Sequence, residues 1–359
     1  ACSTYTGNSF VSHDSSSVIK YIYGNGGKYL SYTGVYTHET YMGEPHPRSY
    51  VETTTDLHGI ECMDLRWFGW HNSSIVNASF TQSSNLEKLF LDGNVSCSSL
   101  DITKNPKLKI IELRDMIIDH DLTFDNHCHL GWLQISSSFQ IRSTNSSHPQ
   151  LNLHGAPNIE FLQLQDMSIE IPDLNHTLKI KHLNLNFMHL SPTTKIRFPD
   201  ISCNKGLATM SIANSGWRFP PNLESNKELS FISAFSNSFD EFRLPTESNC
   251  FYLDVDYCQI ADASKLNVYY GNKLLALKAA NNNHISYQVA TDFTYDGYTV
   301  VETNFREPIE GGGSSQELTH MNSGSGMSGS LDVSNCPDLM VLDVHGNALT
   351  DKNIILYNT

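Results

Sequence analysis

The segment Leu86-Glu-Lys-Leu89-Phe-Leu91 has apolar side chains at its first, fourth and sixth positions. The same spacing recurs in Leu108-Lys-Ile-Ile111-Glu-Leu113 and in Leu130-Gly-Trp-Leu133-Gln-Ile135, and these blocks begin 22 residues apart. A period of this length is typical of chains built from stacked repeats. The spacing continues, with a looser fit in the first case, at Ile60, Met63 and Leu65; Ile159, Leu162 and Leu164; Ile180, Leu183 and Leu185; Leu207, Met210 and Ile212; Leu229, Ile232 and Ala234; Cys250, Leu253 and Val255; Leu274, Leu277 and Ala279; and Leu339, Leu342 and Val344.

A second apolar column precedes the blocks by six residues. It is present before every block except the one at Ile60. Each repeat is therefore expected to contribute two inward-facing segments to a solenoid, because a single repeat cannot bury its own apolar side chains. The members of this column are Phe80, Ile102, Phe124, Leu153, Leu174, Ile201, Leu223, Leu244, Val268 and Val333.

The segment from Leu331 to Leu349 resembles the leucine-rich repeats of bacterial surface and secreted proteins, and Ser99–Leu108 repeats the same phrase. The resemblance covers roughly residues 55–285 and 328–359. It implies a mostly β solenoid with a parallel concave sheet, short strands or loops on the opposite face, and few helices. The family's turn asparagine is present at Asn94, Asn237, Asn282 and Asn347 only, which predicts a less regular spiral.

The repeat divides the chain into four predicted regions. Residues 1–55 contain the strand-like Val18–Tyr23 and are interpreted as an N-terminal cap or edge region, and residues 56–285 form the solenoid. Residues 286–330 are an insertion or degenerate repeats with a Gly/Ser-rich loop, in which Tyr298–Val301 resembles a strand. Residues 331–359 form a final repeat.

The amino-acid composition indicates which class of partner the protein is expected to bind and where the protein is expected to be located. Asp and Glu number 38 against 23 Lys and Arg, which gives a formal charge of -15 and disfavours nucleic acid as a partner. No transmembrane segment is expected, because no run of about 18 apolar residues occurs. The abundance of Ser, Thr and Asn favours an extracellular or cell-surface protein, and Ala1-Cys2-Ser3 is compatible with a lipid anchor at Cys2.

Local motifs predict no enzyme, no cofactor and no metal. Phosphate loops and the common hydrolase signatures are missing from the sequence. His127-Cys128-His129 is the most metal-like cluster, and Asp254-Val-Asp256 could serve a Ca²⁺ site or an acid/base pair, but a solvated acidic patch is the preferred interpretation. The eight cysteines occupy different columns and are expected to be mainly free, buried thiols.

A binding surface follows from alternation along the strands. The second, fourth and sixth residues after the first apolar position point away from the core and are expected to be exposed on the concave sheet. Aromatic rings beside amides suit a peptide, a protein loop or a sugar ring. A cap or packing among neighbours could instead cover them. The predicted ligand-binding residues are Trp132, Phe161, His182, Gln134, Gln163, Gln165, Asn184, Asn186, Phe231 and Tyr252.

The preferred function is a secreted or surface-anchored, non-enzymatic recognition protein that binds a protein or peptide on its concave sheet. One alternative is a glycan-binding surface protein that uses Trp132 and Phe161 as stacking platforms, which a glycan array would reveal. Another is a structural subunit of a larger surface complex, docked through its C-terminal end or its insertion, which would co-purify with a second chain. An enzyme would need a catalytic pair assembled from distant residues.

Overall fold

The computed structural model forms two compact units, residues 1–191 and residues 192–359. The residues that the structure describes are 8–13, 19–25, 54–55, 65–71, 74–75, 78–97, 100–118, 121–136, 140–141, 151–167, 169, 171–188, 198–239, 241–258, 260, 262–280, 292–295, 298–301, 327–349 and 351–356.

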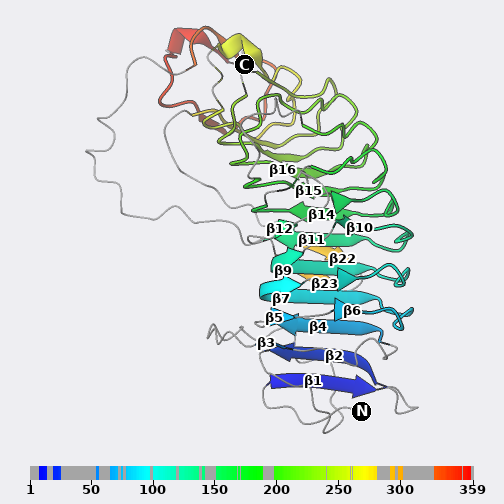
Figure 1. Cartoon of the computed structure of the whole chain (residues 1–359). Helices are drawn as coiled ribbons and strands as arrows, with labels where there is room; N and C mark the ends of the chain where they lie inside the picture. The colour runs from blue at the N-terminus through cyan, green and yellow to red at the C-terminus, as the bar shows by residue number, and fades with distance from the viewer. Residues whose placement is uncertain are drawn as a thin grey trace. The chain divides into compact units, whose positions relative to one another are not determined.

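A ladder of parallel strands forms the front sheet of the first unit. Leu89, Ile111, Leu133, Leu162 and Leu183 stand beside one another in register, so each strand is one turn of a coil. Figure 1 shows these strands stacked side by side. The strands are β4 (Trp67–His71), β7 (Lys88–Cys97), β9 (Ile110–Ile118), β11 (Trp132–Ser136), β14 (Phe161–Leu164) and β15 (His182–Asn184).

An antiparallel hairpin lies at the N-terminal side of this ladder. Strand β1 (Asn8–His13) pairs antiparallel with β2 (Ile19–Asn25), and β2 pairs parallel with β4. The strand expected near residues 18–23 is therefore confirmed. The tyrosine-rich segment 29–50 lies outside the described residues. Short strands β3 (Thr54–Thr55), β5 (Ser74–Ile75) and β12 (Gln140–Ile141) complete the pairing, β3 with β5 and β12 with β9.

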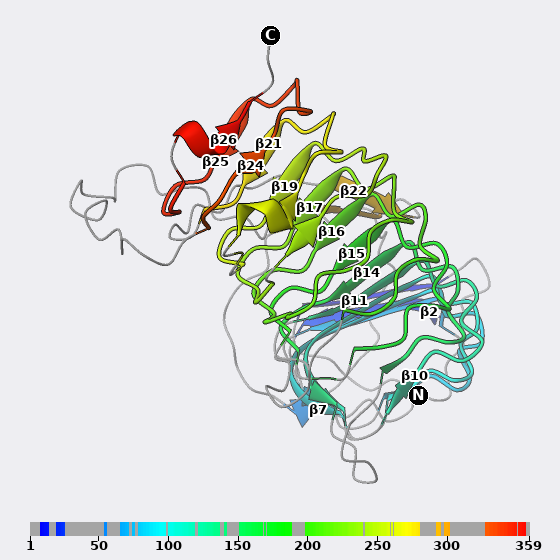
Figure 2. The ribbon, with the colours of Figure 1, turned by 90° about the horizontal axis from the view of Figure 1, so that it is seen from above.

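The second unit repeats the same ladder. Its front sheet consists of β16 (Thr209–Ser211), β17 (Phe231–Ser233), β19 (Tyr252–Asp254), β21 (Ala276–Lys278) and β25 (Val341–Asp343), all parallel (Figure 2). Between β21 and β25 the chain forms a hairpin of β22 (Asp292–Tyr295) and β23 (Tyr298–Val301), and the second of these is the strand that the sequence predicted.

A second row of two-residue strands runs opposite the front sheet, as expected. The pairs are β6 (Ala78–Ser79) with β8 (Leu100–Asp101), β10 (Leu122–Thr123) with β13 (Leu151–Asn152), β18 (Phe242–Arg243) with β20 (Leu266–Asn267), and β24 (Leu331–Asp332) with β26 (Ile354–Ile355). The helices of the described residues are single 3₁₀ turns, η3 (Ala263–Lys265) and η5 (Asp351–Asn353). Each unit is a solenoid of leucine-rich repeats.

Both predicted apolar columns form the core, except that Leu339, Leu342 and Val344 of the last coil are only half-buried. Leu113, Leu133, Leu162 and Leu183 are at most 2% exposed. The column six residues earlier is equally buried, from Phe80 at one end of the described coils to Val333 at the other. The two rows therefore face each other inside the coil, and their burial supplies the main driving force for stacking.

The block assigned to the first coil is wrong. Phe68 stands beside Leu89 and Trp70 beside Leu91, so the block is Leu65, Phe68 and Trp70 rather than the one that begins at Ile60. It begins 21 residues before Leu86, which fits the period better. The physical reason is that an aromatic ring, Phe68, replaces leucine at an inward position, and Phe68 and Leu65 are both fully buried.

The turn asparagine has the role that the family resemblance implies wherever its side chain is described. The Asn237 amide donates to the carbonyls of Ile212 and Ala234, and that of Asn347 donates to Ala279 and Val344. Asn94 and Asn282 lie where the structure describes no side chain. The residue before this position has a φ between 47° and 70° in successive coils, at Asp115, Asp166, Phe187, Asn214, Ser236, Tyr257 and Gly346.

A further polar column links neighbouring coils, and the sequence analysis missed it. Asn226 donates from Nδ2 to the carbonyls of Ile201 (3.0 Å) and Asn204 (2.8 Å) in the preceding coil. Asn105 donates in the same way to Phe80 and Ser83. Both amides are fully buried, at the third residue after the second apolar column. Their shared position in the repeat is the sequence signal that could have identified these two asparagines.

Replacing Asn226 by alanine should destabilise the second unit. Two buried carbonyls lose their donor, which costs about 1–3 kcal/mol each at most. Urea unfolding followed by circular dichroism measures the change. The matched control is Asn222→Ala, because Asn222 is exposed and accepts a single local hydrogen bond from the Glu224 N–H. Equal unfolding midpoints for both variants would contradict the structural role of Asn226.

Candidate functional site

The aromatic column of the predicted surface is present on three adjacent strands. Trp132 pairs in register with Phe161, and Phe161 pairs with His182. The Trp132 and Phe161 rings are stacked, with centroids 4.2 Å apart and planes at 23°, and the centroids of Phe161 and His182 are 6.4 Å apart. Parallel strands separated by about 4.8 Å bring equivalent rings to this stacking distance. The structure therefore brings these three predicted residues together.

The amide column lies beside the aromatic one. Gln134, Gln163 and Asn184 occupy equivalent positions on β11, β14 and β15. Gln163 donates from Nε2 to Oε1 of Gln165 at 2.8 Å, and the Asn186 N–H donates to Oδ1 of Asn184 at 3.0 Å. Hydrogen bonds along the β14 and β15 coils therefore fix the orientation of Gln163 and Asn184.

The expected exposure of this surface is wrong for most of its residues. Trp132 is 0% exposed and Phe161 is 4% exposed, and only His182 and Gln165 are half-buried. Part of the reason is lateral packing, since each stacked ring covers a face of its neighbour. Alternation along a strand predicts the side to which a residue points but not its access to solvent. The other buried members of the set are Gln134, Gln163, Asn184, Asn186, Phe231 and Tyr252.

His182 is the accessible ring of the aromatic column. Burial, followed by the charge of neighbouring Lys181, lowers the pKa of His182 to about 4, although the Glu160 charge opposes the shift. The imidazole is therefore neutral at neutral pH. A neutral imidazole can both donate and accept a hydrogen bond, which suits a polar group of a ligand.

The two predicted residues in the second unit also form a stacked pair. The Phe231 and Tyr252 rings have centroids 4.7 Å apart and planes at 10°. They stand in register on β17 and β19. The Tyr252 hydroxyl lies 3.4 Å from Oδ2 of Asp254, so this stacked pair adjoins a row of charged side chains that includes Asp254.

A row of alternating charge crosses three strands of the second unit. Asp254 on β19 pairs in register with Lys278 on β21, and Lys278 pairs with Asp343 on β25. Asp254 and Asp256 are each 4% exposed, so the expectation of a solvated acidic patch is wrong. Lys278 and Asp343 are not among the residues predicted from the sequence. Extending the outward columns to the blocks at Leu274 and Leu339 would have found both.

Burial controls the ionisation of this row. Burial raises the pKa of Asp254, and burial together with the charge of Asp254 raises the pKa of Asp256. Burial lowers the pKa of Lys278 in spite of the neighbouring carboxylates. Both carboxyls retain local donors, because Oδ1 of Asp256 accepts from the Ala280 N–H at 2.6 Å and Oδ1 of Asp254 from the Asp256 N–H at 3.1 Å.

The candidate metal ligands of the sequence do not converge in the described part of the chain. His127 is 1% exposed and turned into the core, whereas Cys128 and His129 are exposed. No group of three or more His, Cys, Asp or Glu side chains arranged to hold a metal occurs among the described residues. The three side chains form no cluster because His127 points into the core, whereas Cys128 and His129 lie on the surface of a turn.

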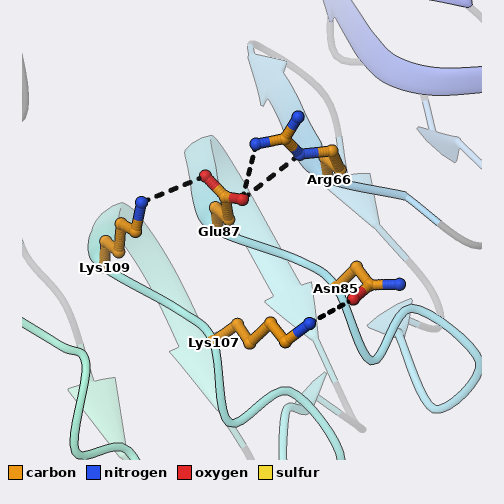
Figure 3. A network of polar contacts seen from close by, with 5 residues as sticks. All are labelled: Arg66, Asn85, Glu87, Lys107 and Lys109. Atoms are coloured by element: carbon orange, nitrogen blue, oxygen red, sulfur yellow. Dashed lines mark hydrogen bonds and ion pairs between the residues drawn. The ribbon is translucent and has the colours of Figure 1, made fainter. Parts of the chain in front are cut away.

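A polar ladder lies just before the front strands of the first unit (Figure 3). Glu87 accepts from Nη2 of Arg66 at 2.6 Å in the preceding coil and from Nζ of Lys109 at 3.3 Å in the next. Burial alone would raise the pKa of Glu87, but Arg66 and Lys109 together lower it below its usual value. Lys107 donates to Asn85 at 2.6 Å in the adjacent row. These contacts align neighbouring coils.

The cysteines whose side chains are described are free. Cys250, Cys258 and Cys336 are buried, as expected, but Cys128 is exposed and Cys203 is half-buried. Burial raises the pKa of Cys250 to about 12, so this thiol is protonated and a poor nucleophile at neutral pH.

Comparison with known proteins finds similarity at the level of solved structures. No family model matches the chain, and no curated protein matches it. The functional domain of InlJ from Listeria monocytogenes, described as including a cysteine ladder, is 15% identical with a TM-score of 0.46, over 60% of this chain and 49% of that one. An internalin (inlF) from Listeria monocytogenes is 14% identical with a TM-score of 0.41, over 65% and 74%. The chain thus spans about half the length of the InlJ domain. The leucine-rich-repeat assignment rests on the register and buried columns of the chain itself.

Alanine substitutions should distinguish the buried residues of the predicted surface from the half-buried ones by their effect on the free energy of unfolding. Trp132→Ala removes a fully buried ring and should lower the free energy of unfolding by about 3–5 kcal/mol. Gln165→Ala, at a half-buried position, should cost less than about 1 kcal/mol. Thermal and urea unfolding measure both. A Trp132→Ala variant as stable as the wild type would show that this ring is not packed as described.

The buried carboxyls should make the second unit less stable as the pH rises. The usual pKa of aspartate is about 4. A raised pKa in the folded state means that the folded chain holds the proton more tightly, so this stabilisation is complete below about pH 4 and is lost as the pH rises through the folded pKa. Asp256→Asn keeps an acceptor for the Ala280 N–H and should reduce the loss.

The measurement is the free energy of unfolding of wild type and Asp256→Asn at pH 5 and pH 8. The wild type should lose more stability between these values than the variant. The charged groups around Asp256 are Asp254, Lys278 and Asp343. An exposed control, Asp338→Asn, should leave the pH dependence of the wild type unchanged, and identical profiles for all three proteins would contradict the role assigned to Asp256.

Proposed function

We propose that this protein is a non-enzymatic recognition protein of the cell exterior, which binds a protein or peptide through the concave sheet. The observation that carries the proposal is the register of the aromatic column with the amide column on β11, β14 and β15. Rings and fixed amides side by side offer apolar contact together with oriented hydrogen bonds, which is the chemistry of peptide recognition.

The accessible residues of this face make the first contact in the proposed binding mode. His182 and Gln165 are half-buried and lie at the margin of a floor made by Trp132 and Phe161. Gln134 adds a buried Oε1 that has no hydrogen-bond donor within the part of the chain that the structure describes. A buried carbonyl of this kind gains free energy when a ligand N–H reaches it.

The chemistry of the described side chains supports binding rather than catalysis. The most deeply buried thiols, Cys250 and Cys258, have raised pKa values and no general base is hydrogen-bonded to either sulfur. The buried carboxyls Asp254 and Asp256 are held by backbone N–H groups and the charge of Lys278, which supports a structural role.

The proposed location is extracellular or at the cell surface. Among the described residues, no helix is long and apolar enough to cross a membrane. The Ser-, Thr- and Asn-rich composition supports export. Cys2, the residue at which the sequence is compatible with a lipid anchor, lies outside the described residues.

The glycan alternative receives less support from the geometry. A sugar ring stacks on an open aromatic face, and neither Trp132 nor Phe161 exposes more than 4% of its surface. A protein ligand needs no open ring face, because backbone and side-chain groups can contact the half-buried His182 and Gln165 directly.

Site-specific photo-crosslinking tests the proposal. A benzoylphenylalanine is placed at position 182, and a matched control carries it at position 175, because Asn175 is exposed on a turn of the same coil. The probes are exposed to surface material of the native source. One protein from this material should crosslink to the probe at position 182 and not to the probe at position 175, because only position 182 lies on the concave sheet.

Binding of the purified crosslinked protein then provides the quantitative test. His182→Ala and Gln165→Ala should each weaken it about tenfold, which is the effect of losing about 1.4 kcal/mol of binding free energy. Equal crosslinking at both positions, or unchanged affinity in both variants, would reject the concave sheet as the binding face. Retention of a glycan on an array by the same chain would favour the glycan alternative.

A further inference from the structure

A buried acceptor and a buried donor, both without a hydrogen-bond partner in the described part of the chain, lie on neighbouring strands of the first unit. The acceptor is Oε1 of Gln134 on β11, and the donor is Nε of Arg114 on β9. The unpaired Oδ1 atoms of Asn105 and Asn226 lie in the interior of the coils, whereas Gln134 and Arg114 belong to outward columns of the concave sheet. Unpaired buried polar atoms cost free energy, so this donor and acceptor need an explanation.

The register of the sheet places the two side chains on a diagonal. Gln134 stands directly beside Glu112, and Arg114 follows Glu112 by two residues, beside Ser136. Residues related in this way are about 7–8 Å apart, and long side chains can cover that distance. No hydrogen bond joins the Gln134 acceptor to the Arg114 donor. The two atoms therefore leave a place between them for a third group.

Glu112 holds the Arg114 guanidinium in a defined orientation. Nη2 of Arg114 donates to Oε2 of Glu112 at 3.3 Å. Because the guanidinium is planar, this contact also limits the direction in which the Nε–H points. The Arg114 side chain is 38% exposed, so a ligand can approach it from solvent without opening the core.

A backbone peptide group has the chemistry that this pair requires. It carries one N–H donor and one C=O acceptor, which point in opposite directions in the trans form. With a hydrogen bond of about 2.9 Å at each end, one peptide group spans roughly 8 Å, which matches the diagonal. A carboxylate could accept from Arg114 but could not donate to Gln134, and an ammonium group could do only the reverse.

We propose that Gln134 and Arg114 together bind one backbone peptide group of the ligand, whose N–H donates to Oε1 of Gln134 and whose C=O accepts from Nε of Arg114. The inference rests on the proposed binding of a protein or peptide at the concave sheet. It makes the ligand an extended segment that crosses the strands. The half-buried Gln165 and His182 lie on the next two coils and contact the same segment. Arg114 was not among the ligand-binding residues predicted from the sequence.

A random peptide library displayed on phage supplies the probes. Peptides selected on the intact chain are kept when a benzoylphenylalanine at position 182 crosslinks to them, which restricts the set to ligands of the concave sheet. In the tightest of these peptides, each backbone N–H is replaced in turn by an ester oxygen, so that one donor is lost and the side chains are unchanged. One ester should weaken binding to the wild type by at least about tenfold.

Variants of the chain identify the partner of that N–H. Gln134→Met removes the acceptor at nearly the same size, so the critical ester should bind this variant as well as the parent peptide does. If Gln134→Met does not fold, Gln134→Asn withdraws the acceptor by one carbon and gives the same comparison. Arg114→Lys keeps the charge beside Glu112 but lacks Nε, and it should weaken the parent peptide about tenfold. The matched control is Gln165→Met, in which the ester should still cost about tenfold.

The outcomes separate this inference from the proposed function. Peptides that lose no affinity at any single ester, or an ester effect that persists in Gln134→Met, would overturn the inference and leave peptide binding in place. A library that yields no ligand of the concave sheet would reject the proposed function, and the inference with it. Binding of an N-acetylated sugar that Gln134→Met weakens would overturn the assignment to a peptide, because an N-acetyl group carries the same donor and acceptor.

Discussion

The stacking of parallel strands in direct register is the constraint on which the rest of this structure depends. Leu133 stands beside Ile111 on one side and Leu162 on the other, without any shift along the strand. Each column of the sequence therefore becomes a row of neighbours in space. The inward rows bury nearly all their apolar surface, which holds the coils together, and the outward rows inherit the same order.

This register also dictates how charge is distributed. Equivalent side chains on adjacent coils are close enough to repel one another when their charges are alike. The chain avoids this by alternation, as in Arg66, Glu87 and Lys109 before the front strands and in Asp254 and Lys278 on the strands themselves. The two rows differ in burial. The first is a surface ladder, whereas the second lies inside the unit, where burial shifts the pKa values of its members.

The turns show where the sequence pattern was sufficient and where it was incomplete. Asn237 and Asn347 have the role that the resemblance to leucine-rich repeats implied. Each side-chain amide donates to two carbonyls where the chain bends sharply. Asn226 performs a similar task at another turn, in a column that also contains other residue types. The repeat block of the first coil was predicted at the wrong residues for a related reason, since Phe68 fills a position that leucine occupies elsewhere.

The sequence by itself determined the period, the two buried columns and the side of the sheet to which Trp132, Gln134 and Phe161 belong, because a repeat of fixed length and two-residue alternation are local properties of the chain. Only the tertiary structure decided how much water reaches those side chains. Trp132 and Asp254 were expected to be exposed and are buried, because solvent access depends on every group packed around a residue rather than on its own position in a strand.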